Sequence, residues 1–118
     1  MKPYIHALSS VKKFGGSVSD YLPIHNKMDS SKSVVPDVRH RSIFHSAFGI
    51  YIIEDIFGET VKNSEGKEVC VRDIAEQHVV EDLGFIPTLQ DWLSEMTVKS
   101  WMIRAEVRKE VRSLTIKK

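Results

Sequence analysis

The sequence has almost no cysteine and no long apolar run. Cys70 is the single cysteine among 118 residues, which excludes a disulfide framework, a cysteine-rich zinc site and a CxxC redox motif. No apolar stretch approaches the length of a membrane span, and the first residues lack the apolar core of a secretory signal. We therefore expect a cytoplasmic protein that has no membrane partner.

The chain also lacks an excess of either charge. Its 17 basic and 16 acidic side chains give a formal net charge of +1. The basic residues are scattered, without regularly spaced aromatic residues among them, so we do not expect nucleic acid as a partner. A Gly-rich phosphate loop and a G-x-S-x-G nucleophile elbow are missing as well. Cys70 lies between Val69 and Val71, which predicts a buried thiol rather than a nucleophile.

Apolar residues recur at helical spacing along most of the chain. Asp37 follows a proline and predicts the N-cap of the longest helix, which ends before Gly58. The expected helices span residues 4–14, 18–31, 38–57 and 73–83, with a short helix that begins at Thr88. The longest helix is expected to be central and packed on several sides, because it is apolar over most of its surface. Its broad apolar arc consists of Phe44, Ala47, Phe48, Tyr51 and Ile52.

Residues 59–71 alternate apolar and polar side chains around the turn Asn63–Gly66, which predicts a β-hairpin. Two strands alone do not form a stable sheet, so the hairpin must lie against helices. The expected fold is mainly α: a compact, bundle-like single domain over residues 1–96 with one β-hairpin, followed by a basic amphipathic C-terminal helix over residues 97–118. The apolar stripe of that helix consists of Ile103, Val107, Val111 and Leu114.

Histidine is frequent in the first two thirds of the chain. The five histidines are His6, His25, His40, His45 and His78. His25 precedes Asp29 by four residues, as His78 precedes Asp82, and side chains at this spacing share one face of a helix. Imidazole is the commonest metal ligand in proteins, and carboxylates complete sites for zinc, manganese, iron or nickel. A helical bundle can build such a site from inward-facing side chains of several helices.

These residues predict a site for a divalent transition metal ion and an anionic substrate. The candidate metal ligands are His25, His40, His45, His78, Asp82 and His6. Glu54 or Asp29 is the candidate catalytic residue, as the general base or as a group that orients a ligand. Guanidinium and ammonium groups suit an anion, and the candidate substrate-binding residues are Lys32, Arg39 and Arg41.

Each of these residues also has an ordinary structural interpretation. A His–Asp pair at the surface contributes about 0.5 kcal/mol or less, which would be the whole role of His25 and Asp29. A core histidine with hydrogen-bond partners explains His40 as well as a metal ion does. On one continuous helix His40 and His45 would diverge by roughly 140° and rise about 7.5 Å apart, so a single ion would have to approach that helix from its side. The arginines are alternatively solvated or paired with acidic side chains.

Several blocks of the sequence resemble a small bacterial and phage family that is described as a domain of unknown function. The blocks are HALSS…FGG (6–16), DYLPIH…DSSK (20–32), DVRHR…H (37–45), RDIAEQHV (72–79) and EDLGFIPT (81–88). The resemblance covers most of the chain, from Tyr4 to Trp92, and includes all five histidines. It implies no activity, because none is established for that family, and the basic tail after Trp92 lies outside it.

Two functions of different classes remain open. The first is a metal-dependent hydrolase that acts on an anionic, phosphate-containing small molecule such as a nucleotide. Its analogy with all-helical phosphohydrolases rests on the fold level, and the adjacent His-Asp dyad typical of those enzymes is missing here. The second is a non-catalytic interaction module whose histidines are structural, and whose C-terminal helix binds a protein partner or a second copy of the chain.

Overall fold

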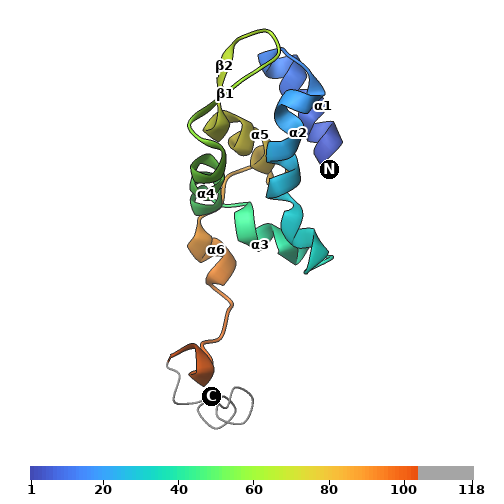
Figure 1. Ribbon diagram of the computed structural model, residues 1–118. Helices are drawn as coiled ribbons and strands as arrows, with labels where there is room; N and C mark the ends of the chain where they lie inside the picture. Colours follow the sequence, from blue (N-terminus) through green and yellow to red (C-terminus); the bar gives the residue numbers. More distant parts are fainter. Residues whose placement is uncertain (104–118) are drawn as a thin grey trace, which may run out of the picture.

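Helices form most of the structure, which is a computed structural model that describes residues 1–103 (Figure 1). The α-helices in this part of the chain are α1 (Pro3–Phe14), α2 (Val18–Met28), α3 (Arg41–Phe44), α4 (Ala47–Phe57), α5 (Val71–Leu83) and α6 (Leu89–Leu93). Short 3-10 helices span Ser30–Ser33, Val38–His40 and Ser100–Met102. Strands β1 (Thr60–Lys62) and β2 (Glu68–Cys70) pair antiparallel. The expected mainly α fold with one β-hairpin is confirmed.

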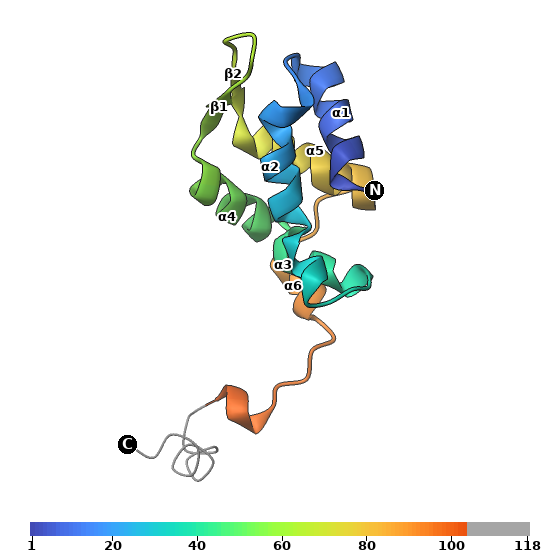
Figure 2. The same ribbon diagram turned by 45° about the vertical axis from the view of Figure 1, so that its right-hand side comes forward.

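Four helices pack around one core. In Figures 1 and 2, α1 and α2 lie side by side, α5 packs against both, and α4 packs against α5. The hairpin lies at one end of this bundle and α3 at the other. Each fully buried aliphatic side chain contributes about 1.5–3 kcal/mol. The buried apolar residues are Ala7, Tyr21, Ile24, Met28, Ile50, Ile53, Val69, Val71, Ile74, Ala75 and Val79.

The turn of the hairpin is bonded to the connection between α1 and α2. The Asn63 side chain accepts hydrogen bonds from the backbone N–H groups of Glu65 and Lys67, both at 2.9 Å, and donates one to the Tyr21 hydroxyl at 3.2 Å. Gly16, with φ of +80°, approaches Asn63 so closely that an added Cβ would lie 2.9 Å from the Asn63 Cβ. A glycine is required there, because a side chain would separate the turn from α1.

The expected alternation of the second strand holds, and it places the Cys70 thiol on the exposed face. Val69 faces the core and is buried, so the neighbouring Cys70 points outward and is exposed. The prediction of a buried thiol is wrong, because the alternation that buries Val69 turns Cys70 to the opposite, exposed face of the strand.

The expected helix over residues 38–57 is broken in the structure. A 3-10 turn and α3 end at His45, whose backbone (φ −89°, ψ 63°) leaves the helical region, and α4 starts afresh. Ser46 caps α4 by accepting a hydrogen bond from the Gly49 N–H at 3.0 Å. Gly49 permits the sharp corner, since a Cβ there would overlap the backbone of Phe44. The capping serine and this glycine outweigh the apolar periodicity that predicted one helix.

The face that α4 turns to the core also differs from the expected arc. Gly49, Ile50 and Ile53 are buried, whereas Phe48 and Tyr51 are more than half exposed, with their rings stacked at 6.1 Å between centroids. Because α4 is apolar apart from Glu54 and Asp55 near its end, the hydropathy pattern does not decide which side packs inward.

The C-terminal part of the described chain leads away from the bundle in both views. Helix α6 begins after Thr88 as expected, and the Thr88 hydroxyl accepts a hydrogen bond from the Asp91 N–H at 3.1 Å. Ile103 is exposed, and the rest of the predicted apolar stripe, Val107, Val111 and Leu114, lies outside the residues that the structure describes. None of the described helices combines the length and the apolar character needed to cross a bilayer.

Replacing Asn63 by alanine is expected to lower the free energy of unfolding by about 2–4 kcal/mol, because two backbone donors lose their acceptor and the Tyr21 hydroxyl loses the hydrogen bond that it accepts. Urea denaturation followed by circular dichroism measures the change. Lys67→Ala is the matched control in the same turn: its exposed side chain should alter stability by less than about 0.5 kcal/mol. Equal stabilities of the two variants would contradict this account of the turn.

Candidate metal centre

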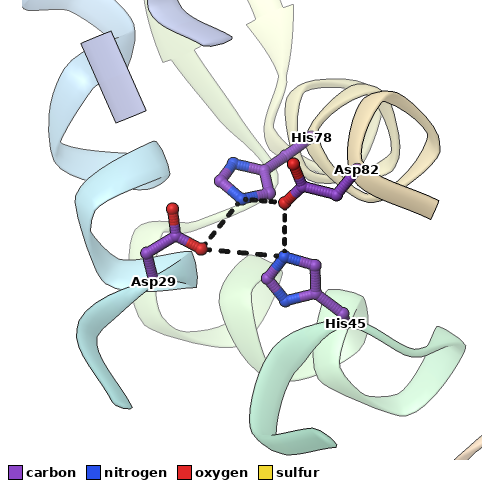
Figure 3. Close-up of side chains that lie close together, drawn as sticks. All are labelled: Asp29, His45, His78 and Asp82. Carbon is purple, nitrogen blue, oxygen red and sulfur yellow. Dashed lines mark hydrogen bonds and ion pairs between the residues drawn. The ribbon is translucent and has the colours of Figure 1, made fainter. Parts of the chain in front are cut away.

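Four side chains from three segments of the chain meet next to the corner between α3 and α4. Asp29 directly follows α2, His45 directly follows α3, and His78 and Asp82 lie one turn apart on α5. Figure 3 shows their imidazole nitrogens and carboxylate oxygens pointing at one another. One donor atom from each residue can be chosen so that all lie within 4.8 Å of one another. This group can hold a metal ion.

The distances between these donor atoms suit a small ion. The His78 Nε2 lies 3.2 Å from the Asp29 Oδ1 and 3.3 Å from the Asp82 Oδ2. The His45 Nε2 lies 2.9 Å from the Asp82 Oδ2 and 3.7 Å from the Asp29 Oδ1. In a tetrahedral site with bonds of 2.0–2.1 Å, neighbouring ligand atoms are roughly 3.3 Å apart. The four distances above are close to this value and all the donor atoms lie within 4.8 Å of one another, so the residues present fit a four-coordinate divalent ion.

The centre is buried, which makes its charges interdependent. The side chains of His45 and His78 are fully buried, and that of Asp82 is 2% exposed. Burial acts to raise the pKa of Asp82, but hydrogen bonds from His45, His6 and His78 outweigh it and hold that pKa far below its ordinary value. For Asp29 burial acts in the same direction, and the hydrogen bond from His78 again leaves a lowered pKa. Two carboxylates therefore stay ionised in the interior.

The imidazoles respond to burial and to these carboxylates in different ways. Burial lowers the pKa of His45, although Asp82 opposes the change. Burial also acts to lower the pKa of His78, but hydrogen bonds to both carboxylates outweigh it and raise that pKa. Among residues 1–103, no carboxylate lies against the ring nitrogens of His25, and its pKa is lowered to about 3 by burial and by the neighbouring His78 and His6.

The other three histidines surround the four-residue centre. The His6 ring stacks on His78 at 3.8 Å and bridges two carboxylates, with Nε2 3.1 Å from the Asp82 Oδ1 and Nδ1 2.7 Å from the Glu81 Oε1. The His25 Nδ1 lies 2.9 Å from the His78 Nδ1. His40 is buried with its ring edge-on to His45 at 5.9 Å between centroids. All five histidines thus gather in one place.

The remaining predicted site residues divide into those near the centre and those elsewhere. Arg41 is near, with its Nη2 3.8 Å from the Asp82 Oδ1. Arg39 is exposed and paired with Asp37, and Lys32 is exposed on the 3-10 helix after α2. Glu54 pairs with Arg72, which precedes Asp82 on α5 by ten residues or roughly 15 Å. The structure does not bring Glu54 into the histidine cluster.

Three buried polar atoms near the centre have no hydrogen-bond partner among residues 1–103. They are the His40 Nδ1, the Arg41 Nε and the His45 Nδ1, all within one short stretch of chain. A buried polar group without a partner costs about 1–3 kcal/mol, so such groups in native proteins usually face a ligand or a water molecule.

Several residues of the cluster escaped sequence reasoning. Ser10 bonds to His25, Gln77 bonds to Ser10, and Glu81 bonds to His6, Ser9 and Gln77. The i, i+4 spacing that identified His78 with Asp82 would also have paired His6 with Ser10 and Gln77 with Glu81. Asp29 was expected to act as a base or an orienting group, whereas its oxygen lies within the set of donor atoms.

The chain matches one known protein family. The family model of a domain of unknown function, DUF6915, matches residues 1–102. The chain belongs to this family. The match includes every residue of the centre and extends ten residues beyond Trp92, where the resemblance in the sequence blocks ends. None of the curated proteins and none of the solved structures matches the chain. The function of this DUF6915 member must therefore be argued from its own side chains.

Lowering the pH from 6.5 to 5 is expected to destabilise the metal-free protein. In this range histidines of the unfolded chain take up protons, with pKa values near 6.5, whereas His25, His40 and His45 have lowered pKa values when folded. The unfolded state then binds more protons, so the free energy of unfolding falls by up to about 1.4 kcal/mol per pH unit for each such histidine. His78, whose pKa is raised, contributes a stabilisation that is already complete below pH 6.5 and is lost only at higher pH.

Urea denaturation in the presence of a chelator, at pH 6.5, 5.75 and 5.0, measures this dependence. Carboxylates contribute little above pH 5, because their pKa values in the unfolded chain are about 4. A free energy of unfolding that stays constant or rises over this interval would show that the buried imidazoles are not held neutral.

Proposed function

We propose that the protein binds one divalent transition metal ion through Asp29, His45, His78 and Asp82, and that it is a metal-dependent hydrolase of an anionic, phosphate-containing small molecule. The convergence of two imidazole nitrogens and two carboxylate oxygens in the protein interior carries the proposal. Two ionised carboxylates balance the charge of a divalent cation, which offsets much of the cost of burying them.

The donor chemistry favours a catalytic ion over a purely structural one. Structural zinc sites are rich in cysteine thiolates, whereas sets of imidazoles and carboxylates recur in catalytic centres. The single thiol, Cys70, is exposed on β2 and is not part of the cluster. Imidazole with carboxylate suits zinc, manganese, iron or nickel, and a larger ion than zinc would accept ligands beyond these four.

A positively charged side chain beside the centre supports an anionic substrate. Arg41 is about three-quarters buried, its Nη2 lies near the Asp82 Oδ1, and its Nε has no acceptor in the described chain. A guanidinium with free donors binds phosphate or carboxylate oxygens. Lys32 places a second positive charge near His40. A bound divalent ion would supply polarisation of a phosphoryl oxygen and a lower pKa of water.

The positions of Asp29, Glu54 and His40 in the structure decide which of them can act as a base. Asp29 serves as a ligand in this proposal, and Glu54 is held in its pair with Arg72. The buried imidazole of His40, whose Nδ1 has no partner within residues 1–103, is available to exchange a proton with a bound substrate.

The second candidate is the non-catalytic interaction module. Complete burial of His45 and His78 and a full set of four protein ligands are typical of closed, structural sites. Exposed apolar side chains of α4, including Phe48, Tyr51 and Ile56, provide a surface for a protein partner or a second copy of the chain. In that case the ion would only fix the ends of α2 and α3 against α5.

Protein purified without a His-tag and stripped with a chelator is expected to bind close to one equivalent of zinc. His78→Ala should weaken binding roughly 100-fold or more, because loss of an outer partner of a ligand alone costs 10–100-fold. Elemental analysis and competition with a chromophoric chelator measure stoichiometry and affinity. Asp55→Ala removes an exposed carboxylate of α4 and should bind as the wild type does. Failure of the wild type to bind zinc, manganese, iron or nickel would contradict the proposal.

Arg41 and Arg39 form a matched pair for testing the hydrolase. With the metal-loaded protein and a panel of nucleotides and simple phosphoesters, Arg41→Ala should lower kcat/KM at least tenfold, about 1.4 kcal/mol of transition-state stabilisation. Arg39→Ala should change it less than twofold, since that side chain is exposed and paired with Asp37. Stoichiometric metal without turnover of any phosphoester, together with a mass that rises with concentration, would instead favour the interaction module.

A further inference from the structure

A chain of hydrogen bonds leads from Gln77 to the metal centre, and its direction can be determined. The Gln77 Nε2 lies 3.0 Å from the backbone carbonyl of His6 and 3.0 Å from the Glu81 Oε1. A carbonyl and a carboxylate only accept hydrogen bonds, so the amide nitrogen must face them as the donor. The Gln77 Oε1 is therefore turned toward Ser10, where it accepts the Ser10 hydroxyl at 2.7 Å.

Ser10 transmits this direction to His25. Its hydroxyl has one hydrogen, which must lie toward the Gln77 Oε1, because two oxygens 2.7 Å apart with no hydrogen between them would repel each other. The Ser10 oxygen, at 2.8 Å from the His25 Nε2, must then accept a hydrogen bond. The proton of His25 is consequently on Nε2.

His25 transmits the direction to His78. His25 is fully buried, and among residues 1–103 its ring nitrogens face only the Ser10 hydroxyl and the His78 ring, so the ring has no counter-charge beside it, is neutral and holds a single proton. With that proton on Nε2, the His25 Nδ1 carries a lone pair, and it lies 2.9 Å from the His78 Nδ1. The His78 Nδ1 must donate to it. The His78 Nε2 is left to face the Asp29 Oδ1 at 3.2 Å and the Asp82 Oδ2 at 3.3 Å.

We infer that Gln77, acting through Ser10 and His25, fixes the tautomer of His78 and so selects Nε2 as the nitrogen offered to a metal ion. Gln77, Ser10 and His25 are positioning residues in this arrangement, and the part that concerns a metal ion rests on the proposed function. A metal-binding imidazole commonly donates its other N–H to an outer partner, which orients the ring and raises its basicity. Here that partner is a second histidine, whose own tautomer is set from the amide of Gln77.

The arrangement also explains the buried polar residues around the centre. If the proton of His25 moved to Nδ1, two N–H groups of His25 and His78 would oppose each other at 2.9 Å, or the His78 Nε2 would carry the hydrogen and have no lone pair for a metal. The His78 Nε2 and the two carboxylate oxygens share either a proton, as in the hydrogen bonds described above, or a metal ion in its place. Ser10 and Gln77 thus turn the Nε2 side of His78 toward a positive charge.

The tautomer of His25 tests the inference without any metal. A long-range nitrogen–proton spectrum of the metal-free, histidine-labelled wild type at pH 7 should show His25 with its proton on Nε2. With zinc added, His78 should show a proton on Nδ1 and nitrogen coordination at Nε2. A His25 proton on Nδ1, or a doubly protonated His25, would overturn the inference.

Ser10→Ala tests the relay, with Ser19→Ala as its control. Ser10→Ala removes the acceptor of the His25 N–H, and we expect mixed His25 tautomers and zinc affinity weakened 10–100-fold. Ser19 is exposed on α2 and, within the described chain, its hydroxyl bonds only to the Ser17 hydroxyl, so Ser19→Ala should keep the wild-type tautomers and zinc affinity within threefold. Unchanged zinc affinity and tautomers in Ser10→Ala would overturn the relay.

The outcomes separate this inference from the proposed function. A wild type that does not bind metal but has His25 protonated on Nε2 would refute the metal centre and leave the tautomer assignment standing. A wild type that binds zinc with His25 protonated on Nδ1 would refute the relay and leave the metal centre standing. If Ser10→Ala does not fold, the wild-type spectrum decides alone.

Discussion

Two ionised carboxylates held close together in the protein interior are the constraint on which the centre of this molecule depends. Asp29 follows α2 and Asp82 lies on α5, and an uncompensated pair of buried negative charges would cost several kcal/mol. The surrounding histidines supply hydrogen bonds to both of them, and Arg41 adds a nearby positive charge. Asp29 and Asp82, together with His45 and His78, form a group of buried donors that can hold a metal ion.

Two residues of the centre lie at points where helices end. His45 reaches the centre because the chain turns a corner between α3 and α4, where Ser46 caps the new helix and Gly49 allows close approach. Asp29 reaches it from the C-terminal end of α2, while α5 contributes regular i, i+4 spacing. The hydrogen-bond chain through Gln77 then gives direction to the histidines. The ends of α2 and α3 place Asp29 and His45 at the centre, and the side-chain hydrogen bonds determine which histidine nitrogens carry protons.

Much of this could be read from the sequence, for identifiable physical reasons. Helical periodicity and capping residues gave the bundle and the hairpin, and the four-residue spacing placed His78 and Asp82 on one face. Residues 38–57 are apolar over most of the surface of the expected helix, so the break at His45 was missed, because periodicity does not register a corner made by a serine cap and a glycine contact. Phe48 and Tyr51 were misplaced for the same reason. The roles of Ser10 and Gln77 depend on contacts between distant segments, which spacing along one helix does not reveal.

The most direct test of the metal centre is a crystal structure of the zinc-loaded protein with anomalous diffraction data at the zinc absorption edge. We expect one strong anomalous peak in the space between α5 and the ends of α2 and α3, about 2.0–2.2 Å from the Nε2 atoms of two histidines, His45 and His78, and from one oxygen each of Asp29 and Asp82. A peak confined to surface side chains, or no peak at this position at full zinc occupancy in solution, would contradict the account.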